Sequence, residues 1–562
     1  MRKGWLQMKR ILIGLLAVLL VVMSVGCSST PSKPAPSTTP AETPADSPGA
    51  AEEPSAEGPG CKVAEDADIV VLNYSDISTF FPANQTQVSE GVPSSLAYES
   101  LLAFDDNMQL KWILAEGVDV SEDGLVYTFK LREGITFSDG TPWNAEAVKA
   151  NFDLITDDSY GFKGVSRLQV IRATEVIDEY TVAVALENPY APFLNVVANF
   201  SGFVSPSLIE KGQDAWSNEI IGTGMYTLTD YRSGESMVFT LKRDYWGYDP
   251  EIAGDALLDG NIGFNTITIK PVSEEATRIA MLLAGEADII NWLTATNIAM
   301  VEGSGMNIVT KPGVMIGYMY FNTAKGPLAD VRVRQALTMA VDVEALNEVV
   351  YGGRNIPGDS IAAPSVSYYV AQKRYEYNIE KAKALLAEAG YADGFTLVAW
   401  EENDTSDIQR GEFIQQQLEQ VGVKLDVYPM EGGVLATEVS GYSGAPEDAG
   451  WDIYIRGYSA STFDPDQALG RFTTPQYPPK GANYSFYSNP VTDELAAKGA
   501  KTTDPDERAA IYKEMQEILW EEMPAVPLLV NTYIGATNEK VEGFSFLGGG
   551  GFYWRNAVYV SE

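Results

Sequence analysis

The chain contains no histidine and only two cysteines, Cys27 and Cys61. Histidine is the commonest general base and the commonest transition-metal ligand. Its absence therefore excludes Ser-His-Asp and Cys-His catalysis, and with them histidine-based zinc or nickel sites. Two cysteines cannot build a disulfide framework. Catalysis by a carboxylate pair, as in glycoside hydrolysis, stays formally open, but no spacing in the chain singles out such a pair.

Basic residues are also scarce. Lysine and arginine together number 39 against 77 aspartates and glutamates, which gives a formal net charge of −38. A surface this acidic repels the phosphates of nucleic acids and of anionic lipids, so we expect no nucleic-acid partner. Solubility is the simplest explanation of the charge, and it predicts no preference for cationic ligands. We also expect no cofactor and no bound metal.

The apolar run near the amino terminus is short. Residues 11–25 carry no charge and follow Lys9 and Arg10, but a helix that spans a bilayer needs about 20 apolar residues. A basic start, an apolar stretch and the small residue Gly26 are typical of an export signal. Residues 1–26 are therefore predicted to be a signal peptide, with an uncleaved membrane anchor as the alternative.

Cys27 directly follows the predicted signal peptide. The sequence S-V-G-C at 24–27 resembles the lipidation site of bacterial lipoproteins, in which the mature chain starts at an acylated cysteine; Ser24 departs from it, because leucine is usual there. Residues 28–60 are rich in proline and serine and cannot bury a core. We therefore predict a lipid anchor and disordered linker over residues 27–65, and an extracytoplasmic protein attached to a bacterial membrane.

About 500 residues remain, which is too long for a single core, so two or more lobes are expected. Strand and helix patterns are mixed along this body without a repeat, which favours an α/β fold. Residues 315–321 and 526–530 are predicted strands, and residues 96–104 a short helix. Asn144 is predicted to cap a helix that ends at residue 155.

Stretches spread over the whole body carry a family resemblance. They are residues 114–153, 221–226 (IGTGMY), 241–247 (LKRDYWG), 285–289 (GEADI), 320–342 (YFNTAKGPLADVRVRQALTMAVD), 377–395 (YNIEKAKALLAEAGYADGF), 463–466 (FDPD) and 507–528 (ERAAIYKEMQEILWEEMPAVPL). In this order they resemble the family 5 substrate-binding proteins of ABC importers, the oligopeptide, dipeptide and nickel cluster. The resemblance covers roughly residues 66–545.

The resemblance implies a two-lobed α/β fold of the periplasmic-binding-protein type (type II, cluster C). Lobe I would comprise residues 66–105, 202–313 and 530–562, with an extra subdomain inserted at 106–201, and lobe II residues 314–529. In this family a peptide lies extended in the cleft between the lobes and is trapped by hinge closure. The implied partner is the pair of permease subunits in the membrane, and the receptor itself is expected to be a monomer.

The resemblance also points to ligand-binding residues. In peptide-binding members a G-W-C-A-D segment precedes a turn, and its acid pairs with the ammonium group of the peptide. Here that segment is GYSAS, in which Tyr458 keeps the aromatic ring and Ser459 follows it. Ser461 stands in place of the acid and supplies no charge. Asp464, in the next turn, is a candidate substitute.

Two aromatic residues complete the predicted ligand site. Trp400 ends a predicted strand before a polar loop, and Tyr74 follows the first strand, in a region that often lines the family's cleft. Stacking on a sugar or a peptide side chain is one interpretation, and ordinary core packing is the other. The predicted ligand-binding set is Tyr74, Trp400, Tyr458, Ser459, Ser461 and Asp464.

The sequence thus predicts a binding lipoprotein of an ABC importer, not an enzyme, that captures a short peptide by hinge closure. An oligosaccharide or a metal chelate is the alternative ligand. A sensory receptor is the alternative role, and a carboxylate-dependent hydrolase the least favoured one.

Overall fold

The computed structural model describes residues 60–162, 165–200 and 202–561. The predicted signal peptide, the predicted lipidation site Cys27 and nearly all of the linker lie outside these ranges. Among the helices within them, none combines the length and the apolar character that crossing a bilayer requires.

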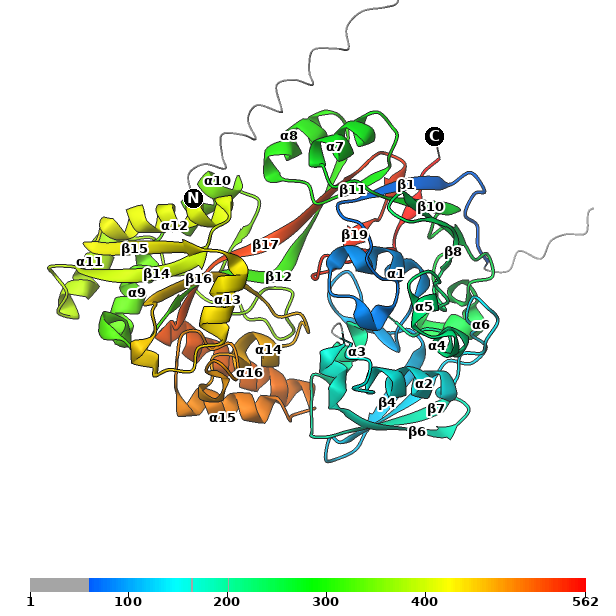
Figure 1. The fold of residues 1–562 in the computed structure, drawn as a ribbon, viewed down its shortest axis with the longest axis horizontal. Helices are drawn as coiled ribbons and strands as arrows, with labels where there is room; N and C mark the ends of the chain where they lie inside the picture. Colours follow the sequence, from blue (N-terminus) through cyan, green and yellow to red (C-terminus); the bar gives the residue numbers. More distant parts are fainter. Residues whose placement is uncertain (1–59, 163–164, 201, 562) are drawn as a thin grey trace, which may run out of the picture. The chain divides into compact units, whose positions relative to one another are not determined.

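A large mixed sheet runs through the body (Figure 1). Its strand order is β15-β14-β16-β12-β17-β11-β1-β10-β9-β8, and β13 pairs with β17 at the side. Parallel pairs such as β1 with β11 stand beside antiparallel pairs such as β12 with β17. The strands are β1 Asp68–Asn73, β8 Tyr226–Arg232, β9 Ser236–Leu241, β10 Thr266–Pro271, β11 Ile289–Asn291, β12 Asn307–Phe321, β13 Ile356–Pro357, β14 Phe395–Glu402, β15 Val423–Met430, β16 Ile453–Ser459 and β17 Ala525–Thr537.

Strands β12 and β17 connect the two lobes. They pair from Asn307↔Thr537 to Tyr320↔Ala525, and they meet β11 of lobe I at one end and β16 of lobe II at the other (Figure 1). The strands predicted at 315–321 and 526–530 are confirmed, but both are longer than the apolar patterns indicated. No apolar alternation marks the rest of β12, because its first residues, NIVTKP, mix apolar with polar side chains and are exposed or half-buried.

A second sheet lies within residues 106–201, the range predicted for the inserted subdomain. Its order is β4-β5-β7-β6, and all neighbours are antiparallel. Helix α2 (Ala145–Ile155) packs on β6 and β7. The strands of this sheet and of the small two-stranded sheets are β4 Ala115–Val120, β5 Val126–Leu131, β6 Ile171–Asp178, β7 Thr181–Leu186, β2 Leu102–Phe104 with β3 Leu110–Trp112, β18 Val541–Glu542 with β21 Val558–Tyr559, and β19 Ser545–Phe546 with β20 Phe552–Tyr553.

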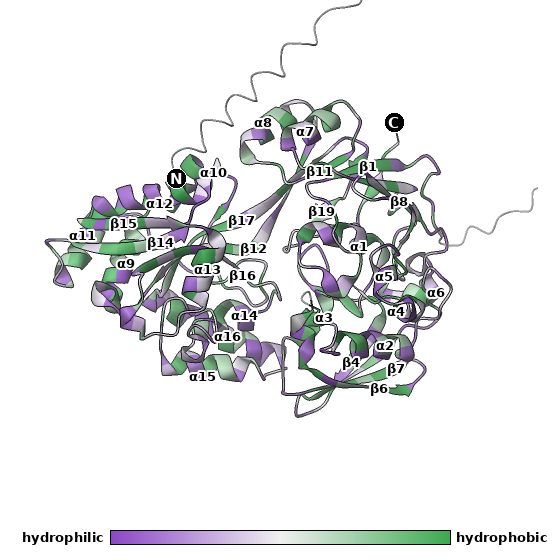
Figure 2. Ribbon diagram, in the orientation of Figure 1, coloured by the Kyte–Doolittle hydropathy of each residue, from purple (hydrophilic) through white to green (hydrophobic). Residues whose placement is uncertain are grey.

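Most of the helices begin at a side chain that caps them. Asn144 accepts a hydrogen bond from Ala147 N at 3.0 Å, which confirms the predicted cap of α2. Figure 2 shows both hydrophilic and hydrophobic residues along most helices, as expected where one face packs on a sheet. The other helices are α1 Gly91–Ala97, α3 Phe193–Ala198, α4 Pro206–Lys211, α5 Gln213–Trp216, α6 Pro250–Ala253, α7 Glu275–Leu283, α8 Ala295–Gly303, α9 Val331–Met339, α10 Val343–Tyr351, α11 Ile379–Glu388, α12 Thr405–Glu419, α13 Gly432–Ser440, α14 Pro465–Gly470, α15 Pro490–Gly499 and α16 Pro505–Glu522.

The helix predicted over residues 96–104 is wrong. Helix α1 ends at Ala97, and the same stretch continues into strand β2. The cause is a distant segment, because Gly224 N donates to Ala97 O at 2.9 Å. Gly222 approaches the same carbonyl so closely that a Cβ there would lie 2.1 Å from Ala97 O. This contact uses a backbone group at the helix end, and no local pattern in the sequence could predict it.

Candidate functional site

A cavity of about 770 Å³ is lined by residues from both lobes. Lobe I contributes the end of α1, the segment around Glu99 and the chain between Leu547 and Arg555. Lobe II contributes Val314 at β12, Ser459 at the end of β16, and residues 461–463 in the turn that follows. Since the walls come from segments on both sides of the crossing strands β12 and β17, a change in the angle between the lobes changes this volume.

The charged residues of the cavity lining are Glu99, Arg167 and Arg555. The Glu99 carboxylate accepts hydrogen bonds from Trp246 Nε1 and Thr223 Oγ1, both at 2.9 Å, and from the Tyr245 hydroxyl. Burial, together with the Glu99 charge, raises the pKa of Tyr245 well above its usual value, so this hydroxyl remains a donor. Neutral donors therefore already stabilise the Glu99 charge.

The Arg555 guanidinium is more weakly paired. Its Nη1 lies 3.8 Å from Glu99 Oε1, and its Nη2 donates to Ala256 O at 2.7 Å. Arg167, which also lines the cavity, is exposed and lies in the short 3₁₀ helix before β6. The lining thus carries two positive charges and one negative charge, in a chain whose formal charge is −38. An anionic group of a ligand would meet a favourable potential here.

Two of the predicted ligand residues, Ser459 and Ser461, lie in the lobe II wall of the cavity. Ser461 O accepts a hydrogen bond from Asn199 Nδ2 of lobe I at 2.9 Å. Tyr458 lies beside them on β16, and the Arg471 guanidinium is 3.5 Å from the centre of its ring. Arg471 is only 3% exposed, so this cation–π contact helps to compensate a buried charge. Ligand contact by these three predicted residues stays a prediction.

The contacts of Asp464 are those of a residue that stabilises the fold. It is fully buried, caps α14 through Asp466 N, and forms a bidentate pair with Arg508 at 2.7 and 2.8 Å. A carboxylate that is already paired with a guanidinium and absent from the cavity lining is not available to a ligand amine. The predicted substitution of Asp464 for the missing acid therefore receives no support from the geometry. The described lobe II residues that line the cavity therefore include no acid to replace the one that is missing at Ser461.

Trp400 and Tyr74 lie away from the cavity lining. The Trp400 ring is 5.3 Å from that of Trp451 and covers Gly450, where a Cβ would lie 2.4 Å from the indole. This is the core packing that was the alternative interpretation. The ring of Tyr74 lies 4.7 Å from that of Trp292, just beyond the carboxyl end of the inner strand β1. For both residues, ligand contact stays a prediction.

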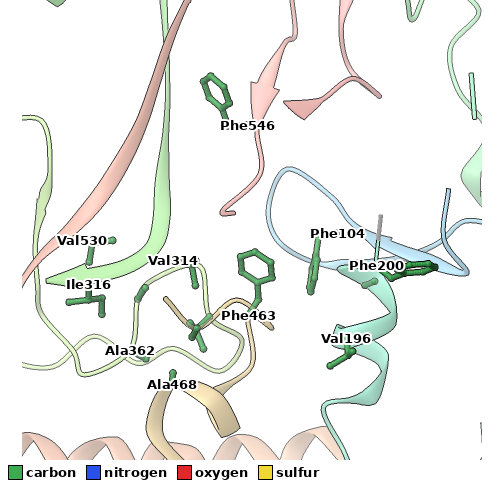
Figure 3. Close-up of a cluster of buried hydrophobic side chains, with 14 of the residues drawn as sticks. Phe104, Val196, Phe200, Val314, Ile316, Ala362, Phe463, Ala468, Val530 and Phe546 are labelled. Atoms are coloured by element: carbon green, nitrogen blue, oxygen red, sulfur yellow. The ribbon is translucent and has the colours of Figure 1, made fainter. Parts of the chain in front are cut away.

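Phe463 is a cavity residue that the predicted set lacks. Its backbone has φ +55°, in the left-handed region, and its ring is 4% exposed. The ring lies 5.1 Å from that of Phe104 in an edge-to-face arrangement, and Figure 3 shows the two rings facing each other. Phe463 is therefore a lobe II side chain that reaches an aromatic surface of lobe I.

Sequence reasoning also missed Glu99, Arg167 and Arg555. The available signal was weak: Glu99 is a lone acid in the apolar stretch 96–104, and Arg555 is a lone cation in the aromatic run F-Y-W-R. An isolated charge among apolar residues has to find a partner in the fold. The sequence does not show that these two residues, at opposite ends of the body, are neighbours.

One acidic group could be mistaken for a metal site. Glu402, Asp404 and Asp407 place carboxylate oxygens within 4.8 Å of one another. However, Glu402 pairs with Arg456 at 3.0 Å and Asp407 with Arg410 at 2.6 Å. These arginines already compensate the charge, so the cluster supplies no basis for a cation site.

A two-lobed α/β body with crossing strands, and with a cavity lined from both sides of them, defines a solute-binding receptor. Comparison with known proteins gives the family. The model of "Bacterial extracellular solute-binding proteins, family 5 Middle" matches residues 109–479. The proteins named glutathione-binding protein GsiB from Shigella dysenteriae serotype 1 and from Escherichia coli K12 are each 35% identical over 496 residues, which cover 87% of this chain and 94% of theirs. The chain belongs to the bacterial extracellular solute-binding proteins of family 5.

Solved structures show the same fold. HbpA2 from Haemophilus parasuis has a TM-score of 0.79 at 26% identity and covers 88% of this chain and 100% of its own. The murein tripeptide-binding protein MppA, in an unliganded open form, has a TM-score of 0.78 at 21% identity, with 90% and 99% covered. These likenesses confirm the predicted fold class and the family resemblance. The extracellular setting of the family agrees with the predicted extracytoplasmic location.

Proposed function

We propose that this protein is the receptor of an ABC importer and captures a short acidic peptide of the glutathione type between its lobes. The observation that carries the proposal is the cavity with walls from both lobes, whose charged lining is two arginines and one glutamate. A bound peptide would complete the wall of each lobe, so binding would favour the closed arrangement. The receptor then acts by binding and release and catalyses no reaction.

The charge of the lining supports an anionic ligand. Glu99 already has three protein donors, whereas Arg555 lies 3.8 Å from it and Arg167 is exposed. The wall of lobe II offers no free acid for a ligand ammonium group, because Ser461 is neutral and Asp464 is paired with Arg508. Recognition through carboxylates therefore fits this cavity better than recognition through an amino terminus. The relatives named for glutathione, a peptide with two carboxylates, support the same class.

The proposal includes a membrane tether and a permease. Cys27 would carry the lipid, and the linker would hold the body near the transmembrane subunits that accept the ligand. A tethered receptor has a high effective concentration at its partner. Replacing Cys27 with serine should release a protein with unchanged affinity into the medium, as membrane fractionation would show; retention in the membrane fraction would overturn the lipid anchor.

The ligand class is tested by titration calorimetry of the detergent-purified full chain. The probes are reduced glutathione, the tripeptide Ala-Ala-Ala, maltotriose and Fe(III)-EDTA. We expect glutathione to bind most tightly and to raise the melting temperature, since a ligand that binds only the folded state stabilises it. Tight binding of maltotriose or of the chelate alone would overturn the peptide assignment.

A further inference from the structure

Trp292 follows strand β11 with an unusual backbone. Its φ is +56°, in the left-handed region that favours glycine, and its side chain is 42% exposed. A bulky residue in this region is uncommon and adds conformational strain. Strained residues of this kind cluster where a side chain must be held in a particular direction, so the position calls for an explanation.

The strain arises from a bulge. Asn291 of β11 pairs with Gly535 of β17. Two residues further along the chain, Leu293 N donates a hydrogen bond to the carbonyl oxygen of Ile534, the neighbour of Gly535, at 2.9 Å. Trp292 is therefore an extra residue without a partner on β17. Bulges of this type redirect a side chain out of the regular strand alternation, and they are frequent next to binding sites.

A buried cation fixes this conformation. Arg278 of α7 is 3% exposed, and its Nη2 donates to Trp292 O at 2.9 Å. Its Nη1 donates to Val272 O and Ser273 O, both at 2.8 Å. The guanidinium thus ties the bulge to the loop before α7, and charge-assisted hydrogen bonds of this kind are strong. The backbone of Trp292 is held by the fold and does not depend on the contacts of its ring.

The indole forms an aromatic platform with two tyrosines, Tyr74 and Tyr533. The ring centres of Tyr74 and Trp292 are 4.7 Å apart, and those of Trp292 and Tyr533 are 5.8 Å apart. Tyr533 lines the cavity, so the platform continues the cavity wall toward the surface. Tyr74 and Trp292 each follow the carboxyl end of a strand, and these strands, β1 and β11, are parallel neighbours. Ligands of open α/β sheets bind beyond such strand ends.

We propose that the platform of Tyr74, Trp292 and Tyr533 is a subsite for an aromatic side chain of the bound peptide. This inference rests on the proposed function, because it requires a peptide ligand. The exposed part of a rigidly held indole offers a flat apolar surface, and aromatic groups stack on it in offset or edge-to-face arrangements. The neighbouring cavity holds the charged groups of the peptide, so the subsite would select among peptides by one side chain.

The test compares Ala-Ala-Ala with three tripeptides that carry one phenylalanine at the first, second or third position. Titration calorimetry of the full chain should show about 5- to 10-fold tighter binding of one phenylalanine peptide. Trp292→Ala should abolish this preference and leave the affinity for Ala-Ala-Ala unchanged. Trp292→Phe, which keeps a ring, should restore part of the preference. The matched control is Tyr377→Ala, because Tyr377 is 40% exposed and lies in lobe II before α11.

The possible outcomes separate this inference from the proposed function. If the peptides bind but none of the phenylalanine variants is preferred, or if the preference survives in Trp292→Ala, the subsite is wrong and the receptor function stands. If glutathione binds but none of these tripeptides does, the subsite is wrong and the receptor function stands. If neither glutathione nor any of the tripeptides binds the unaltered protein, both proposals fail. Melting curves of the variants exclude misfolding as the cause, since Arg278 and the bulge do not depend on the indole.

Discussion

The two lobes place their charges differently. Lobe I brings Glu99, Arg167 and Arg555 to the cavity lining, whereas the lobe II residues that line it, from Val314 to Phe463, are neutral. Lobe II keeps its ionic groups behind this wall, for example in the buried pair of Asp464 with Arg508. Lobe I is therefore equipped to recognise a charged ligand, and lobe II can close on it without bringing another charge out of water.

The two lobes also differ in how a carboxylate inside the protein is compensated. Glu99 of lobe I receives three hydrogen bonds. Glu401 of lobe II is fully buried, and neither of its oxygens has a hydrogen-bond donor among the described residues. Its neighbour Arg410 is 3.9 Å away and is already paired with Asp407 at 2.6 Å. The charge at the cavity is thus well compensated, whereas a carboxylate in the lobe II core is not.

The largest effect is expected from the cation at the cavity. Arg555→Leu should weaken glutathione binding by about 2–4 kcal/mol, roughly 30- to 1000-fold in Kd, because the ligand carboxylate loses a charged partner. Titration calorimetry measures the change. Arg555→Lys should lose less, and Arg232→Leu, at an exposed position, serves as the control. An unchanged Kd in Arg555→Leu would show that the charge difference between the two lobes plays no part in ligand recognition.

The second largest effect is expected on the pH dependence of the free energy of unfolding, to which Glu401 contributes. Burial raises the pKa of Glu401 from 4.5 to about 8. The folded state therefore binds a proton more tightly than the unfolded state, so the stabilisation is complete below pH 4.5 and is lost as the pH rises through about 8. Denaturant unfolding should show a decrease of about 2–3 kcal/mol between pH 6 and pH 8.5 from this group.

The matched variant for this prediction is Glu401→Gln, which keeps the shape and cannot ionise. It should remove this part of the pH dependence and be more stable than the unaltered protein at pH 8.5. If the two proteins show the same pH profile, a donor reaches Glu401 in solution, and the contrast with Glu99 disappears.

A smaller effect is expected at the contact between the two walls. Phe463→Ala removes a ring that is 4% exposed and packs edge-to-face on Phe104, so closure should be weaker and the Kd about 5- to 30-fold higher, a loss of about 1–2 kcal/mol. Phe104→Ala should have a similar effect from the other lobe. Because the two rings contact each other, the double variant should lose less than the sum; additive losses would contradict a shared contact.

The smallest effect should come from adding a charge to the neutral wall. Ser461→Asp should raise the Kd for glutathione by about 3- to 10-fold, near 1 kcal/mol, through repulsion of its carboxylates. It should also strengthen binding of Ala-Ala-Ala-amide, whose only charge is its ammonium group. Ser461→Asn has nearly the same shape without the charge and should change neither affinity. Equal effects of both substitutions would show that shape, not charge, matters at this wall.

Much of the fold could be predicted because its signals are local or repeated along the chain. The cap at Asn144 follows from neighbouring residues, and the ordered motifs identify the two-lobed class. The helix predicted over 96–104 was wrong because Gly224 takes the carbonyl at its end. The extra length of β12 was missed because strand pairing, not apolar alternation, holds its first half.

The site was less predictable than the fold. Ser459 and Ser461 were singled out because they belong to a short segment with a known pattern. Both line the cavity, and their contact with a ligand stays a prediction. Glu99 and Arg555 were missed because their role depends on each other's position across the length of the chain. Asp464 became a candidate because the sequence does not show that Arg508 pairs with it, and the geometry gives that candidate no support. Local patterns predict single residues, and long-range pairing decides which of them face the ligand.

The ladder between β12 and β17 has a mechanical consequence. Its register is interrupted between Pro312 and Ile316, where Asn531 Oδ1 takes the Met315 amide at 3.1 Å and lies so close to Gly313 that a Cβ there would be 2.2 Å away. Backbone hydrogen bonds between paired strands stiffen a ribbon, so we expect this one to bend most easily where its pairing is interrupted, over residues 312–318. The expected bend thus lies in the segment that joins the two lobes. Amide exchange should be faster around residues 313–315 than in the continuously paired part of β12, residues 307–312.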